Sequence, residues 1–174
     1  MKHPLLHAFI AASVVIVSSS FALAQGEIRS EKIGLILTVP PRWQVTEGSP
    51  VLALDYPVAV TTPYKGFTPN IVVTDEVFSG SSDEYASEVT RSFGNAFSTS
   101  KLISKGKFKT NAGISGTKLV VRNTVMGVVL RQVFYLFPSK SGLMLTFTVS
   151  SPVEQGFKHD KAIDDSMRKV VIAK

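Results

Sequence analysis

The 174-residue chain contains no cysteine, one tryptophan and three histidines. Without cysteine it can form no disulfide, carry no lipid on a thiol and perform no thiol chemistry. His3 and His7 lie close to the N-terminus, so His159 is the only histidine in the remainder of the chain. Metal sites and nucleophile–base pairs usually need several such side chains. We therefore expect a protein that is not an enzyme, with no catalytic residue, metal ligand or cofactor.

A second long apolar run is also missing, and the first one has the pattern of a secretory signal peptide. Lys2 supplies a positive start, residues 8–17 are apolar, and Ala22-Leu23-Ala24 is a small–x–small cleavage pattern. The alternative is an uncleaved anchor, but serines interrupt a stretch that is barely long enough to span a membrane. We expect residues 1–24 to be a signal peptide and residues 25–174 to be one exported domain, periplasmic or secreted.

The charge is modest. The formal net charge is +6 at pH 7, and removal of Lys2 with the signal peptide lowers it to +5. A mildly basic protein favours acidic partners or an anionic membrane surface, to which peripheral contact is expected. Export argues against nucleic acid as a partner, and none is predicted.

Alternating apolar residues and turn signals predict a chain rich in strands. Asn111-Ala112-Gly113 reads as a turn, and Met126-Gly127 as the turn of a hairpin. The segment 58–62 is expected to be an edge strand because prolines flank it. The predicted strands are 33–39, 51–56, 58–62, 70–78, 102–110, 114–125, 128–137 and 143–149.

Two helices are predicted. Ser81 followed three residues later by Glu84 is a capping box, and an apolar stripe with helical spacing follows it. Ser150-Ser151-Pro152 is expected to cap a last helix that runs to about Arg168. The apolar stripe of the first helix comprises Tyr85, Val89, Phe93, Ala96 and Phe97, and the inner residues of the second are Phe157, Ile163, Met167 and Val170.

The order of these elements predicts the fold class. Strands that follow one another without long crossovers form antiparallel hairpins. The segment 128–137 is apolar on both faces, so both faces of the sheet should be covered. We expect an α+β fold, an α/β/α sandwich in which two main helices flank a central antiparallel sheet.

The pattern of core and turn positions over nearly the whole predicted domain resembles the PsbP-like superfamily, which includes PsbP and the DcrB-type exported proteins. The resemblance rests on the following matching positions: Val39-Pro40 followed by Trp43, the strand Pro69–Val73, Gly113 and Gly116, the strand Arg131–Tyr135, Gly142, the strand Leu145–Thr148, and Phe157 in the closing helix. It implies an α/β/α sandwich and a non-enzymatic accessory or binding role. It transfers no ligand-binding residue, because members of one fold bind very different partners.

Two groups of residues are candidates for partner binding. Tyr64, Lys65 and Phe67 lie in a proline-bounded loop, where the aromatic rings could either meet a partner or fold back onto the domain. Lys105, Lys107 and Lys109 alternate along a predicted strand and so project from one face. They could form a basic patch for an acidic protein or lipid headgroup, although lysines commonly protect edge strands.

The remaining polar residues favour structure over chemistry. His159 is expected on the surface, and His159-Asp160 and Asp164-Asp165 are more typical of a solvated helix face than of a cation site. Asp75 and Glu76 are neighbours on a strand, so they point to opposite faces and cannot act as a catalytic pair. Trp43 follows two prolines just past a strand and is predicted to close the core at the sheet edge.

These observations leave two functional hypotheses. The first is an exported accessory protein of the cell envelope that acts through protein–protein contacts, with a partner that the sequence does not identify. The second is a carrier or chaperone that shields an apolar ligand or segment in a groove between the sheet and a helix. A hydrolase is the least favoured class because the candidate catalytic residues are so few.

Overall fold

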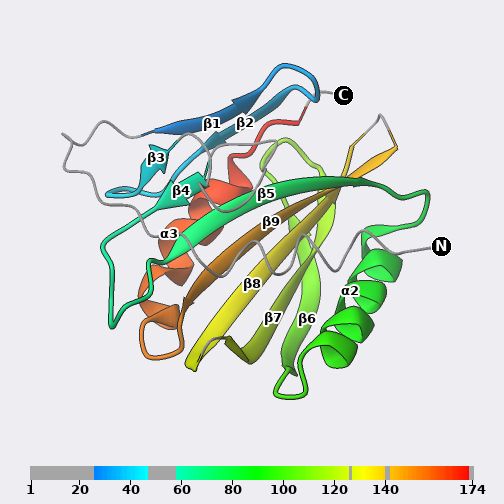
Figure 1. Ribbon diagram of the computed structural model, residues 1–174. Helices are drawn as coiled ribbons and strands as arrows, with labels where there is room; N and C mark the ends of the chain where they lie inside the picture. Colours follow the sequence, from blue (N-terminus) through cyan, green and yellow to red (C-terminus); the bar gives the residue numbers. More distant parts are fainter. Residues whose placement is uncertain (1–25, 47–57, 126, 140–141, 173–174) are drawn as a thin grey trace.

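The computed structural model describes residues 26–46, 58–125, 127–139 and 142–172 (Figure 1). The predicted signal peptide and the predicted strand 51–56 lie outside these residues. The elements are β1 (Glu27–Ser30), β2 (Leu35–Thr38), β3 (Gln44–Thr46), β4 (Val58–Val60), β5 (Asn70–Val77), α2 (Ser82–Ala96), β6 (Lys101–Lys109), β7 (Ser115–Val125), β8 (Val128–Pro138), β9 (Leu143–Pro152) and α3 (Gly156–Arg168). Neither described helix is long and apolar enough to cross a membrane.

The main sheet has seven strands in the order β3-β4-β5-β9-β8-β7-β6, and every neighbouring pair is antiparallel. A separate hairpin, β1–β2, pairs through Ile36 with Val171 near the C-terminal end of the described chain. The register confirms the predicted hairpin turn, because Val125 lies opposite Val128 at the end of the β7–β8 ladder. Gly127 there has φ 79°, a conformation that glycine adopts without strain.

Alternation along the strands sends apolar side chains to both faces of the sheet. In β9, Leu145, Phe147 and Val149 face the core shared with α3 and the β1–β2 hairpin, whereas Met144 faces the core beneath α2. The two helices therefore cover opposite faces (Figure 1). This arrangement confirms the predicted α+β sandwich with a central antiparallel sheet.

Helix α2 forms as its sequence predicts. The Ser81 side chain accepts a hydrogen bond from the Glu84 backbone N–H, and the Glu84 carboxylate accepts one from the Ser81 backbone N–H at 2.7 Å. The Glu84 carboxylate also accepts a hydrogen bond of 2.8 Å from the Ser81 hydroxyl. The hydrogen bonds from the Ser81 backbone N–H and from this hydroxyl lower the pKa of Glu84 below its ordinary value. Tyr85, Val89 and Phe93 are buried against the sheet, as the predicted stripe requires. The last turn differs from the prediction, because Ala96 is exposed and Phe97 is only partly buried against this core.

Helix α3 begins later than predicted. Strand β9 continues through Pro152, which lies opposite Leu130 of β8, so the expected cap at Ser150–Pro152 is wrong. The long β8–β9 ladder keeps these residues in the sheet, and α3 starts at Gly156 without a side-chain cap. Phe157 is 77% exposed and is not an inner residue, whereas Ile163, Met167 and Val170 are buried as expected. The first turn of α3 thus presents an aromatic ring to solvent.

Strand β4 is not at the edge of the sheet, contrary to expectation. Its residues Val58–Val60 pair with β3, a short strand that sequence reasoning missed. Three residues of mixed polarity carry too little alternation to reveal a strand, and only pairing with β4 defines it. The other neighbour of β4 is β5, where Ala59 lies opposite Ile71.

Candidate functional site

The two predicted groups of binding residues lie on opposite sides of the molecule. Tyr64, Lys65 and Phe67 belong to the loop between β4 and β5, whereas the three lysines lie on β6 at the far edge of the sheet (Figure 1). Five inter-strand steps of about 4.8 Å separate β4 from β6, which gives roughly 24 Å. The two groups therefore cannot contact one small ligand together.

The β4–β5 loop is a tight turn that presents Lys65. Tyr64 and Phe67 exchange two backbone hydrogen bonds of 2.8 and 3.0 Å, and Lys65 and Gly66 between them have φ 48° and 79°. Two successive positive φ angles define a type I′ turn, in which a lysine is unusual. Phe67 is only 6% exposed, so its ring packs against the domain and supports the loop. Tyr64, the other aromatic candidate, is partly exposed.

Lys65 is fixed by two contacts on this exposed turn. Its ammonium lies 5.3 Å from the centre of the Tyr64 ring and 3.5 Å from a carboxylate oxygen of Glu154, which precedes α3. Tyr64 and then Glu154 raise the pKa of Lys65 above its ordinary value. The loop is thereby joined to the start of α3.

A second strained turn contacts the same end of α3. The Trp43 N–H donates to the Pro40 carbonyl at 3.1 Å, and Arg42 between them has φ 70°. With Pro41 at the second position, this geometry is that of a type II turn, whose third residue is usually glycine. The Trp43 ring is 2% exposed and meets the His159 ring edge-on at 5.8 Å. Trp43 therefore closes the core, as the sequence predicted.

The first turn of α3 brings the remaining groups together. His159 is half-buried and not fully on the surface as expected; burial, together with the positive charges of Lys158 and Arg42, lowers its pKa. The exposed Phe157 ring lies 5.0 Å from the Arg131 guanidinium. We call Arg42, Tyr64, Lys65, Phe157 and His159 the loop-end surface. Sequence reasoning found only Tyr64 and Lys65, because no local pattern marks the other three.

The aspartates of α3 hold the helix on the sheet. Asp160 binds the Arg131 guanidinium through two hydrogen bonds of 2.8 Å. Asp164 accepts hydrogen bonds from the Lys118 ammonium at 2.6 Å and from the Tyr135 hydroxyl. Within the described ranges, no group of three or more histidine or acidic residues is placed to hold a metal ion.

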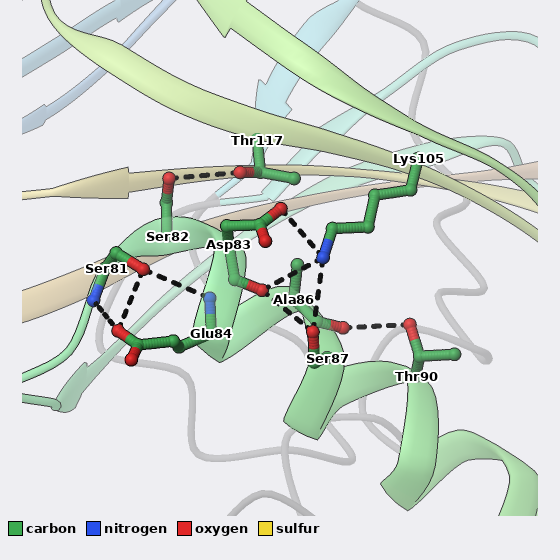
Figure 2. Close-up of polar contacts among 9 residues, drawn as sticks. All are labelled: Ser81, Ser82, Asp83, Glu84, Ala86, Ser87, Thr90, Lys105 and Thr117. Carbon is green, nitrogen blue, oxygen red and sulfur yellow. Dashed lines mark hydrogen bonds and ion pairs between the residues drawn. The ribbon is translucent and has the colours of Figure 1, made fainter.

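The lysines on β6 do project from one face, but they do not act alike. Figure 2 shows that the Lys105 ammonium contacts the Asp83 carboxylate at 2.7 Å, the Asp83 carbonyl at 3.1 Å and the Ser87 hydroxyl at 3.1 Å. Lys105 therefore attaches the first turn of α2 to the sheet, whereas its role in partner binding stays a prediction. Among the residues that the structure describes, Lys107 and Lys109 form no ion pair.

A row of buried polar side chains also crosses the central strands. Asn70, Ser150 and Gln132 lie opposite one another on β5, β9 and β8, and each is at most 1% exposed. The Gln132 amide donates to the Ser150 hydroxyl at 3.0 Å, and the Asn70 amide donates to the Thr68 carbonyl at 3.0 Å. Because polar residues in a strand are usually expected to face water, sequence reasoning missed this row.

Three solved structures have a similar fold. LpqN, described as involved in cell envelope biogenesis of Mycobacterium tuberculosis, superposes with a TM-score of 0.61 and 15% identity over 81% of this chain and 84% of its own. Cyanobacterial PsbP (CyanoP) from Synechocystis superposes with a TM-score of 0.60 and 13% identity over 90% of this chain and 98% of its own. PA94 of Pseudomonas aeruginosa, a protein of unknown function, superposes with a TM-score of 0.53 and 15% identity over 75% of this chain and 96% of its own.

These likenesses confirm that the chain has the PsbP-like fold, as the sequence pattern predicted. No protein-family model matches the sequence, and no curated protein matches it. At 13–15% identity the likeness extends to the fold alone, so any ligand or partner has to be argued from the residues of this chain.

Proposed function

We propose that this protein is an exported, non-catalytic accessory protein of the cell envelope that binds a partner protein through the loop-end surface. The observation that carries the proposal is that Arg42 and Lys65, two exposed basic residues, both have positive φ angles at this surface. Such conformations cost about 1–3 kcal/mol each and are concentrated at functional sites. Glycine would form either turn with less strain, so the side chains themselves have a reason to be there.

The surface has the composition of a protein interface. Phe157 offers an exposed aromatic ring, and Arg42, Lys65 and Tyr64 surround the start of α3 with residues that are enriched at interfaces or complementary to acidic groups. The predicted signal peptide and the printed role of LpqN in cell envelope biogenesis support a position at the envelope.

The carrier hypothesis has less support. The space between α2 and the sheet is occupied by side chains, because Tyr85, Val89 and Phe93 are at most 3% exposed. The Phe93 ring lies 5.1 Å from the Phe134 ring of β8. An apolar ligand would have to displace these residues, which would cost the burial that holds the helix on the sheet.

Site-specific photo-crosslinking in cells tests the proposal. A photoreactive phenylalanine analogue at position 157 should give a discrete protein adduct, whereas the same analogue at Val77 should not. Val77 is a suitable control because it is 81% exposed, close to the 77% of Phe157, and lies at the other end of β5 from the β4–β5 loop.

Substitutions at the strained turns complete the test. Arg42→Gly should leave stability unchanged or raise it by up to about 1 kcal/mol, because glycine accepts a positive φ. The same substitution, and Lys65→Glu, should weaken the adduct at position 157. Equal crosslinking at both positions, an adduct with lipid in place of protein, or an adduct that both substitutions leave intact would contradict the proposal.

A further inference from the structure

Strand β6 forms a long open edge of the sheet. It spans nine residues, pairs only with β7 among the described strands, and is exposed at every position except Phe108. At the other end of the described sheet, β3 spans three residues within the part of the chain that the structure describes. A strand with one unpaired side presents a row of backbone N–H and C=O groups that can pair with another chain. At the end of this row the Lys109 carbonyl accepts a hydrogen bond of 3.5 Å from the Arg168 side chain, which an added strand would have to replace.

The charge on this edge selects the kind of chain that could pair. Strand β6 contains four lysines and no acidic residue, and Lys101 lies opposite Arg122 of β7. Among the described residues, Lys101, Lys107, Lys109 and Arg122 have no ion-pair partner. A second copy of this protein paired through β6 would bring lysine stripes together, and like charges on neighbouring strands repel. An acidic segment would instead neutralise them.

The shape of the edge limits the length of such a segment. The β6–β7 register is regular from Ser104 to Lys109, a stretch of six residues, and is shifted between Leu102 and Ser104. A bulge at that point bends the strand, so pairing beyond it would lose alignment. The regular part includes Lys107 and Lys109, both on the face that carries α2.

Gly106 gives the edge a second distinctive feature. A side chain built at Gly106 would meet no atom within 4 Å, and its φ angle lies outside the range that favours glycine. Neither crowding nor backbone conformation therefore requires glycine here, although glycine weakens a strand by about 0.5–1 kcal/mol. A glycine inside a strand often marks a place where another backbone comes close. The open space lies beside Phe108, on the face opposite the lysine stripe.

We propose that β6 binds an acidic, extended segment of a partner protein, which adds to the sheet as an eighth strand along Ser104–Lys109. Acidic side chains at alternate positions of the segment pair with Lys107 and Lys109. The intervening side chains lie on the other face, where Gly106 leaves room. This surface is separate from the loop-end surface, so it can fail or hold independently of the proposed function.

Peptide binding to the purified exported protein tests this inference. The probe is a fluorescently labelled, terminally blocked six-residue peptide of alternating glutamate and valine, followed by fluorescence anisotropy. We expect saturable binding that weakens as the salt concentration rises. A peptide of the same sequence with N-methyl groups on alternate backbone amides keeps the charge but cannot pair as a strand, and it should not bind. A lysine–valine peptide should also fail.

Variants of the protein identify the charges involved. Each cross-strand charge pair contributes modestly, so the double variant Lys107→Gln/Lys109→Gln should weaken peptide binding by about two- to thirtyfold. The control Lys32→Gln/Lys169→Gln removes the same charge from exposed positions outside β6 and should change binding less than twofold. Arg42→Gly on the loop-end surface should also leave peptide binding unchanged.

Four results would overturn the inference. Absence of binding to the glutamate–valine peptide would mean that the lysines only protect the edge. Equal binding of the N-methylated peptide would mean attraction without strand pairing. An equal effect of the control variant would remove β6 as the site, and a dimer of the free protein that Lys107→Gln/Lys109→Gln alters would assign the edge to a second copy.

Discussion

Replacement of Trp43 by alanine should be among the most destabilising single changes in this protein. Its ring is 2% exposed and fills the space between the Pro40–Trp43 turn and α3. Burial of a tryptophan removes about 150–250 Å² from water, which at ~25 cal/mol per Å² is about 4–6 kcal/mol as an upper value. Measured losses for such truncations are about 3–5 kcal/mol, and we expect a loss in that range.

The assay is urea unfolding followed by far-ultraviolet circular dichroism, because the variant lacks the only tryptophan. Domains of this kind have a net stability of about 5–15 kcal/mol, so a loss of this size would lower the midpoint strongly or leave part of the protein unfolded in buffer. Phe157→Ala is the control: that ring is 77% exposed, and its truncation should cost less than about 1 kcal/mol.

Two results would refute the reasoning. A loss below about 1 kcal/mol for Trp43→Ala would mean that the ring does not close the core. In the unsubstituted protein, tryptophan emission at the wavelength of a water-exposed indole would have the same meaning, because the buried ring predicts a blue-shifted spectrum.

Two further predictions concern His159 and Gly116. Burial lowers the pKa of His159 below its ordinary value of 6.5, so the unfolded chain binds the proton more tightly than the folded protein does. The contribution of His159 to stability should therefore be full above about pH 6.5 and decline below it. In pH-dependent thermal unfolding, His159→Gln should flatten this decline. A Cβ atom at Gly116 would lie 2.3 Å from the Leu136 carbonyl oxygen, so Gly116→Ala should lower the free energy of unfolding in urea by about 1–3 kcal/mol or more. A Cβ atom at Gly94 would meet nothing within 4 Å, so Gly94→Ala should raise that free energy by up to about 1 kcal/mol. An unchanged slope for His159→Gln, or equal effects of the two alanine variants, would contradict these expectations.

Part of the candidate site could be read from local sequence. Prolines around Tyr64 and Lys65 mark a turn, and alternation places Lys107 and Lys109 on one face. Local sequence does not show whether such a side chain is already engaged within the domain, because that depends on residues far away in the chain. Lys105 has the same spacing as its neighbours, yet Asp83, 22 residues earlier, engages it.

The sequence by itself determined the features that depend on neighbouring residues. Alternation in 143–149 set the two faces of β9, the capping box at Ser81 and Glu84 set the start of α2, and proline spacing set the turn before Trp43. These follow from local backbone geometry, which a few consecutive residues control.

Only the tertiary structure decided the features that depend on which distant segments meet. Pairing with β8 kept Pro152 in the sheet and delayed the start of α3, and this in turn left Phe157 exposed beside Arg131. Contact between two turns and one helix end likewise brought Arg42 and Lys65 to a common surface. Local patterns cannot specify such contacts, because hydrophobic burial and strand pairing are satisfied by partners far apart in the chain.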